Sequence, residues 1–225
     1  MKIVDHSLAR IAARARPTDD WIHPSAVGTA HLGGYGVGEF GDAGSYYPNL
    51  WTWAVKLLNI ESVIDVGCGE AHSTRFFLEL GCDAIGVEGY APAIERSGIV
   101  DRIVVHDYCD GPYVPNREFD LAWSCEFVEH VEERYLPNFM ATFSRAACVF
   151  MTFAQPGAPG HHHVNAQEQA YWVAQFAARG YELDRELTEC GRRIALADRF
   201  LLSPAEDNAT YFAQSGCVFV HRRQG

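Results

Sequence analysis

The chain has little positive charge, no long hydrophobic run and no Cys-x-x-Cys pair. Its 18 Lys and Arg residues stand against 29 Asp and Glu residues, which gives a formal net charge of −11. An acidic chain repels phosphate backbones, so a nucleic acid is disfavoured as a partner. No apolar run approaches the roughly 20 residues that a membrane-spanning helix needs, so we expect no membrane contact. The seven cysteines are scattered and odd in number, which favours free thiols and a cytoplasmic protein over a disulfide scaffold.

The composition is that of an ordinary globular domain. Of the 225 residues, 48% are hydrophobic and 21% are charged, enough to bury one full α/β core. We therefore expect a single domain over residues 1–225. Within it, residues 1–50 would form an N-terminal helix and a Gly- and Tyr-rich segment, and residues 51–225 the core. The Gly- and Tyr-rich segment has two open interpretations, a lid over a site or a plain surface connection.

From residue 62 onward, short β-branched runs alternate with helical patterns. This alternation predicts an α/β fold of the doubly wound kind, a mostly parallel sheet covered by helices on both faces. No clear helix separates the last two strands, so one of them is free to run antiparallel, and residues 188–215 read as an insertion or a loop. The expected strands are 62–67, 83–88, 102–106, 119–125, 146–153, 181–187 and 216–222. The expected helices are 48–58, 72–80, 91–97, 133–145 and 166–179.

Three of the expected strands end in groups suited to a nucleoside. The first runs into Asp65-Val66-Gly67-Cys68-Gly69, a tight loop whose bare backbone can approach a ligand. The second ends at Glu88, where an acid can accept hydrogen bonds from ribose hydroxyls. The third leads into Asp107 and Tyr108, an acid for an adenine amino group and a ring for stacking. Ligands of open α/β sheets bind beyond these carboxyl ends.

The glycine loop does not fit a dinucleotide. A dinucleotide fingerprint requires a third glycine where this chain has His72. In addition, Asp65 precedes the loop and would face the negative charge of a pyrophosphate. The acid favours a cationic or amino-bearing ligand instead.

These three motifs resemble those of the class I, Rossmann-like methyltransferases that depend on S-adenosylmethionine. The resemblance implies a seven-stranded sheet whose last strand is antiparallel. It also implies that Glu88 holds the ribose, that the adenine lies near Asp107, and that the methionine end lies near Asp65 and Gly67. The cofactor-binding residues that we predict are Asp65, Gly67, Cys68, Gly69, Glu88, Gly89, Asp107, Tyr108, Ser124 and Cys125.

A second polar cluster follows the fourth and fifth strands. Glu126, Glu129 and His130 have i, i+3, i+4 spacing, which places them on one face if the turn is helical. The loop after the fifth strand carries the run Gly160-His161-His162-His163-Val164-Asn165. The two loops are neighbours in a doubly wound sheet and can meet. Carboxylates and imidazoles together suit Mn²⁺, Fe²⁺, Co²⁺ or Zn²⁺, and Mg²⁺ less well.

The second cluster resembles metal-dependent O-methyltransferases. It is similar to the small-RNA 3′-end 2′-O-methyltransferases and, in part, to the ubiquinone-pathway O-methyltransferases. By that resemblance the metal ligands would be Glu126, Glu129, His130 and one of His161–His163, for which we take His163. The chain departs from the pattern because its downstream histidines are consecutive and because its acidic charge does not suit an RNA end. A metal-free site and purely structural roles stay open.

We therefore predict an S-adenosylmethionine-dependent methyltransferase that acts on a hydroxyl oxygen of a small molecule. Glu129, His130 and His163 are the predicted catalytic residues, because a metal or a histidine base would deprotonate the acceptor. One alternative is a metal-independent N- or carboxyl-methyltransferase with a histidine base. Another is a non-catalytic S-adenosylmethionine-binding subunit of a partner protein.

Overall fold

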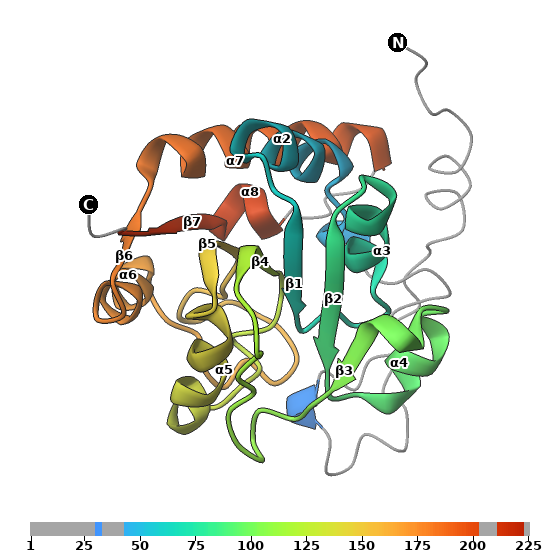
Figure 1. Cartoon of the computed structure of the whole chain (residues 1–225). Helices are drawn as coiled ribbons and strands as arrows, with labels where there is room; N and C mark the ends of the chain where they lie inside the picture. Colours follow the sequence, from blue (N-terminus) through green and yellow to red (C-terminus); the bar gives the residue numbers. More distant parts are fainter. Residues whose placement is uncertain (1–29, 33–42, 203–210, 223–225) are drawn as a thin grey trace.

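Seven strands form one twisted sheet with helices on both faces, in a computed structural model that describes residues 30–32, 43–202 and 211–222 (Figure 1). The strands lie in the order β3-β2-β1-β4-β5-β7-β6. They are β1 Ser62–Val66, β2 Asp83–Glu88, β3 Ile103–Val105, β4 Phe119–Ser124, β5 Ala146–Met151, β6 Tyr181–Leu183 and β7 Cys217–His221. The α-helices are α2 Pro48–Leu58, α3 His72–Glu79, α4 Ala91–Arg96, α5 Leu136–Phe143, α6 Gln169–Ala177, α7 Arg185–Leu202 and α8 Tyr211–Ser215. Short 3₁₀ turns are η2 Ala30–Leu32, η3 Ala43–Ser45, η4 Val100–Arg102 and η5 Glu133–Tyr135.

The strand pairing confirms the predicted Rossmann-like fold. β1 pairs in parallel with β2 on one side and with β4 on the other. β3 and β5 extend the parallel part, whereas β7 runs antiparallel to both β5 and β6. The five parallel strands therefore end at the same edge of the sheet, and the loops that follow them lie together there.

Alternating side chains divide the core into two layers. Leu121 and Trp123 of β4 face the layer that includes buried residues of α2, α3, α7 and α8. Ala122, the residue between them, faces the other layer, which α5 and α6 cover. This period of two is what a strand buried on both faces requires, and it explains the near-continuous apolar runs in the sequence.

The chain after β6 differs from the sequence prediction. Helix α7 begins at Arg185, inside the expected strand 181–187, and α8 follows at Tyr211, where a loop or an insertion was expected. The cause is Asp184, whose side chain accepts a hydrogen bond from the Leu187 amide at 2.9 Å and so caps the new helix. The expected N-terminal helix over residues 1–17 lies outside the described residues. None of the described helices combines the length and apolar content that crossing a membrane requires.

Helix α7 fixes the start of α2 through one buried carboxylate. Asp198 accepts hydrogen bonds from the Asn49 amide at 3.1 Å, the Asn49 side chain at 2.7 Å and the Leu50 amide at 3.1 Å. The side chain is fully buried, and burial raises the pKa of this carboxyl to about 6. The first amides of α2, which have no partner inside the helix, are thereby satisfied.

We expect Asp198→Ala to lower the free energy of unfolding by about 2–3 kcal/mol, because it leaves buried donors of α2 without an acceptor. Asp198→Asn keeps one acceptor oxygen and should lose less. Urea denaturation followed by circular dichroism measures both. An Asp198→Ala protein with the midpoint of the wild type would contradict the capping role.

Candidate active site

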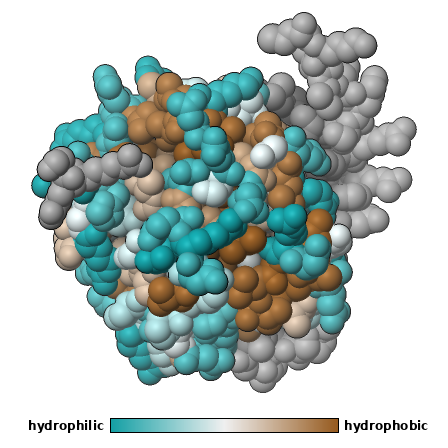
Figure 2. All heavy atoms as spheres, in the orientation of Figure 1, coloured by the Kyte–Doolittle hydropathy of each residue, from teal (hydrophilic) through white to brown (hydrophobic). Residues whose placement is uncertain are grey.

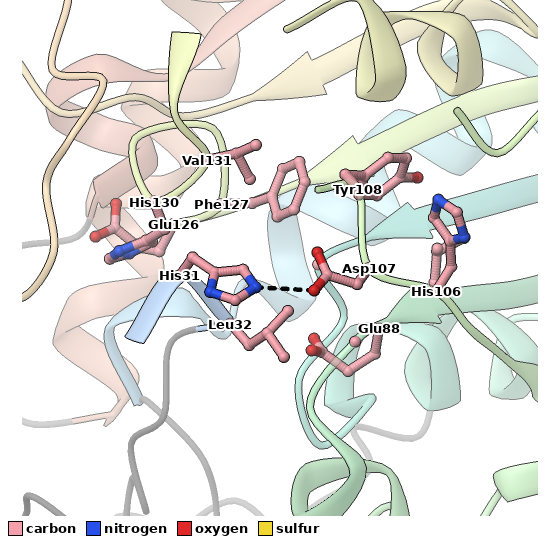
Figure 3. A pocket seen from close by; sticks show the side chains of 13 residues that line it. His31, Leu32, Glu88, His106, Asp107, Tyr108, Glu126, Phe127, His130 and Val131 are labelled. Atoms are coloured by element: carbon pink, nitrogen blue, oxygen red, sulfur yellow. Dashed lines mark hydrogen bonds and ion pairs between the residues drawn. The ribbon is translucent and has the colours of Figure 1, made fainter. Parts of the chain in front are cut away.

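A pocket opens at the carboxyl edge of the parallel strands and joins the two predicted clusters (Figure 3). Its walls come from the ends of β1, β2, β3 and β4 and from the short turn η2, which precedes the sheet in the chain. The lining residues are His31, Leu32, Gly67, Val87, Glu88, Gly89, His106, Asp107, Tyr108, Glu126, Phe127, His130 and Val131. One cavity thus contains the acids predicted to bind a nucleoside, Glu88 and Asp107, and two of the predicted metal ligands, Glu126 and His130.

The glycine loop closes tightly against its neighbours. Gly67 has a φ of 73°, in the left-handed region, and its amide donates to the Val87 carbonyl at 2.9 Å. A Cβ atom at this position would lie 2.5 Å from the ring of Phe127, closer than real contacts allow. Position 67 therefore requires glycine both for its backbone angle and for the approach of Phe127.

Glu88 ties the glycine loop to the loop after β2. One carboxylate oxygen accepts a hydrogen bond from the Gly69 amide at 2.8 Å, and the other accepts one from the Tyr90 amide at 2.7 Å. Burial raises the pKa of this carboxyl. Each oxygen keeps a further lone pair, so the carboxylate that shapes the loop can also accept from a ligand hydroxyl in the pocket.

Asp107 carries a contact that the sequence does not reveal. Its Oδ1 accepts a hydrogen bond from the Cys109 amide at 2.8 Å, and its Oδ2 lies 2.8 Å from Nε2 of His31 (Figure 3). The hydrogen bonds from His31 and Cys109 hold the pKa of Asp107 below its usual value, against the desolvation that opposes them. An adenine amino group at this acid would share Oδ2 with His31, which reaches it from 76 residues earlier in the chain.

Five of the predicted cofactor residues are absent from the lining of this pocket: Asp65, Cys68, Gly69, Ser124 and Cys125. Asp65 is buried and accepts hydrogen bonds from the hydroxyls of Ser73 at 2.5 Å and Thr74 at 2.6 Å. Burial raises the pKa of this carboxyl to about 6. Asp65 therefore faces the start of α3 and not the pocket. Its hydrogen bonds tie the end of β1 to the first turn of α3, on either side of the glycine loop. Ser124 likewise donates to the Val66 carbonyl and joins the ends of β1 and β4.

The second cluster brings three of the four predicted metal ligands together. Glu126, His130 and His163 each place a ligand atom within 4.8 Å of the others. The rings of His130 and His163 have centroids 5.2 Å apart. Glu126 has a left-handed φ of 53°, which is rare outside glycine, and its amide donates to the Thr152 hydroxyl at 2.9 Å. The β4 loop therefore turns sharply to present this carboxylate to the pocket.

Glu129 lies outside that cluster of ligand atoms. The expected helical face does not form, because the chain from Glu126 to Val131 makes turns before η5 begins. The Glu129 side chain is fully buried, and neither carboxylate oxygen has a hydrogen bond of good geometry among the described residues. Burial raises the pKa of this carboxyl to about 7. The side chain nevertheless lies beside that of Glu126, so its predicted role as a ligand or catalytic group stays a prediction.

The two loops meet through backbone hydrogen bonds, as the strand order predicts. The amides of Val164 and Asn165 both donate to the Glu129 carbonyl, at 2.9 and 3.0 Å. This bifurcated contact fixes the histidine run against the turn after β4. His163 thereby reaches the cluster, whereas His161 and His162 are not members of it.

The two clustered imidazoles have free lone pairs. Burial and the neighbouring histidines lower the pKa of His130 to about 4, so its ring is neutral near pH 7, and its buried Nδ1 has no partner among the described residues. Nδ1 of His163 lies 3.3 Å from the Ala158 carbonyl. A carbonyl only accepts, so this contact favours the tautomer with its proton on Nδ1, which has its lone pair on Nε2. One carboxylate and two imidazoles fit a divalent transition metal.

Two parts of the pocket wall are formed by residues that were not among the predicted site residues. His31 and Leu32 belong to the Gly- and Tyr-rich segment, of which residues 33–42 lie outside the described part. Leu32 packs so close to Gly89 that a Cβ there would meet it at 2.6 Å. Phe127 directly follows Glu126. Its position just after the carboxyl end of β4 was the one feature of the sequence that could have predicted it as a pocket residue.

We expect Glu88→Gln to weaken binding of S-adenosylhomocysteine about 10- to 100-fold. One side-chain oxygen becomes an amide nitrogen, which cannot accept from Gly69 or Tyr90, and a hydrogen bond to a charged group contributes about 1.5–3 kcal/mol. Isothermal titration calorimetry measures the affinity. Glu95→Gln, at an exposed position on α4, is the matched control and should bind like the wild type. Equal affinity in the Glu88 variant would refute the assigned role.

Comparison with known proteins identifies the family. A family model described as a methyltransferase domain matches residues 6–191. A probable tocopherol O-methyltransferase, chloroplastic, of Oryza sativa subsp. japonica is 33% identical over 98 residues, which are 39% of this chain and 26% of that protein. This match therefore spans about a quarter of the relative's length.

Solved structures share the fold at low sequence identity. A TehB-like SAM-dependent methyltransferase from Corynebacterium glutamicum has a TM-score of 0.54 at 17% identity, over 81% of this chain and 90% of that one. The YcgJ protein from Bacillus subtilis has a TM-score of 0.50 at 14% identity, over 77% of this chain and 98% of that one. The family match covers most of the chain and the sheet has the expected order, so the chain belongs to the methyltransferase domain family and is a class I S-adenosylmethionine-dependent methyltransferase.

Proposed function

We propose that this methyltransferase methylates a hydroxyl oxygen of a small molecule, with a divalent metal held by Glu126, His130 and His163. The observation that carries the proposal is the convergence of these three ligand atoms within 4.8 Å of one another. Glu126 and His130 also line the pocket that contains Glu88 and Asp107. The donor groups and the ligand groups therefore share one cavity.

The composition of the cluster favours Mn²⁺, Fe²⁺, Co²⁺ or Zn²⁺. One carboxylate and two imidazoles supply oxygen and nitrogen ligands and leave coordination positions open. When bound, such a metal lowers the pKa of a hydroxyl group and orients its oxygen for attack. Nδ1 of His163 lies 3.3 Å from the Ala158 carbonyl, and a hydrogen bond from the second ring nitrogen to a carbonyl is the outer contact that a metal-binding histidine commonly makes.

The residues of the chain act mainly by positioning. The methyl group of the sulfonium is already electrophilic, so the reaction requires donor and acceptor to be held in line. Glu88 and Asp107 offer hydrogen-bond acceptors to the nucleoside, while Phe127 and Val131 form apolar wall beside Glu126 and His130. This apolar wall helps to exclude water from the point of transfer.

The low basicity of His130 argues against this residue as the general base of the metal-free alternative. A ring with a pKa of about 4 is a weak general base for a hydroxyl group, because an effective base has a pKa near the working pH. The partial match to a probable tocopherol O-methyltransferase also supports oxygen as the acceptor atom. The net charge of −11 favours an acceptor that is not a polyanion.

We expect chelation to remove methyl transfer and added Mn²⁺, Co²⁺ or Zn²⁺ to restore it. The assay measures S-adenosylhomocysteine release across a library of small hydroxyl compounds. Glu126→Gln should lower turnover about 100-fold, through the lost charged ligand, and leave S-adenosylhomocysteine affinity within about threefold. Glu118→Gln removes a charge from an exposed ion pair with Arg145 and is the control. Full activity after exhaustive chelation would overturn the metal, and transfer only to amines or carboxylates would overturn the acceptor.

A further inference from the structure

The turn that carries His163 is held from two sides, and we propose that Asn165 and Gly160 are the positioning residues that fix the His163 ring for methyl transfer. Neither residue lines the pocket, so each acts through the histidine and not on a ligand. The inference rests on the proposed function only in assuming that His163 takes part in it.

Asn165 fastens the base of the turn. It is 1% exposed, and all its side-chain polar atoms lie in a protein interior. Its amide donates to the Glu129 carbonyl at 3.0 Å, and its Nδ2 donates to the Val128 carbonyl at 3.3 Å. Its Oδ1 accepts from the Gln167 side chain at 3.2 Å. Asn165 therefore joins the histidine loop to the turn that presents Glu126 and His130, the other two members of the cluster.

Gly160 leaves the space that the ring occupies. A Cβ atom at position 160 would lie 2.0 Å from Cε1, 2.2 Å from Nε2 and 2.6 Å from Nδ1 of His163. Gly160 is not among the glycines with positive φ, so the backbone would accept alanine and only the ring would have to move. The imidazole is thus seated directly on the glycine backbone.

The two contacts give His163 one orientation and one tautomer. Between them the chain turns through His162, which has a left-handed φ of 49° that a non-glycine residue adopts only when its surroundings hold it. The same turn brings Nδ1 of His163 to 3.3 Å from the Ala158 carbonyl, a contact that favours the tautomer protonated at Nδ1. If the hydrogen bonds of Asn165 are lost, the left-handed backbone at His162 loses its support. The contact between His163 and the Ala158 carbonyl, which favours one tautomer, is then lost as well.

Two variants test the inference by independent routes. Asn165→Asp is nearly isosteric but replaces the Nδ2 donor with an oxygen that faces the Val128 carbonyl. Gly160→Ala leaves Asn165 intact and displaces the ring sterically. We expect each to weaken Mn²⁺ binding about 10- to 100-fold and to lower kcat by a similar factor, the range typical of outer contacts of metal ligands. The KM for S-adenosylmethionine should change less than about threefold, because the pocket lining is untouched.

A readout without metal separates this inference from the metal hypothesis. Long-range ¹H–¹⁵N correlation spectra of the metal-free protein report the tautomer of each histidine. The wild type should show His163 protonated at Nδ1, and both variants should show a mixture of tautomers. Asn49→Ala, which removes the side-chain amide bond to Asp198 far from this loop, controls for a general loss of stability and should keep the wild-type tautomer.

The outcomes are distinct. Failure of the wild type to bind Mn²⁺, together with a tautomer that changes in both variants, would overturn the metal and support the positioning role. A single Nδ1-protonated tautomer in both variants, with Mn²⁺ affinity within about twofold of the wild type, would overturn the positioning role. A mixed tautomer already present in the wild type would overturn it as well.

Discussion

The parallel pairing of β1 with β2 and β4 is the constraint on which the whole site depends. In this register Asp65 lies opposite Gly86 on one side and Trp123 on the other. The three strands consequently end together, and the groups that follow them line one pocket. A slip of one residue would turn every side chain of a strand to the opposite face, and the buried apolar layers on both faces oppose such a slip.

The two halves of the site are joined by contacts between loops. Phe127, in the turn after β4, packs on Gly67 of the cofactor loop. The same turn accepts the amides of Val164 and Asn165 at the Glu129 carbonyl. The turn after β4 therefore contacts both the nucleoside end and the histidine end of the pocket. A shift of this turn would move residues at both ends of the pocket. The reaction depends on the alignment of two bound molecules, so such a shift would disturb it.

The sequence predicts the fold and the cofactor end well, because their signals are local. The strands that lead to Gly67, Glu88 and Asp107 can each be recognised in the sequence by a short apolar run. A glycine or an acidic residue marks the end of each run. The approach of His31 to Asp107 is not local, and no pattern in the sequence indicates it. The sequence does not predict helix α7 because its many charged residues hide an amphipathic face. The residue that caps it, Asp184, also falls inside the strand expected over 181–187.

The second cluster shows where spacing alone misleads. The i, i+3, i+4 pattern places Glu129 beside Glu126 and His130 only if the segment is helical. The left-handed backbone at Glu126 starts a sharp turn instead. Glu126 and His130 line the pocket, and Glu129 is fully buried beside Glu126 without lining it. The meeting of this turn with the histidine loop was predictable from strand order, whereas the resemblance left the choice among His161, His162 and His163 open.

The central claim is that the nucleoside end and the metal cluster belong to one working site. Anomalous X-ray scattering from crystals grown with S-adenosylhomocysteine and Mn²⁺ tests it directly. We predict the nucleoside at Glu88 and Asp107 and one anomalous peak between Glu126, His130 and His163, at about 2.0–2.2 Å from their ligand atoms. Bound S-adenosylhomocysteine with no peak at these three residues, or a metal held elsewhere, would contradict it.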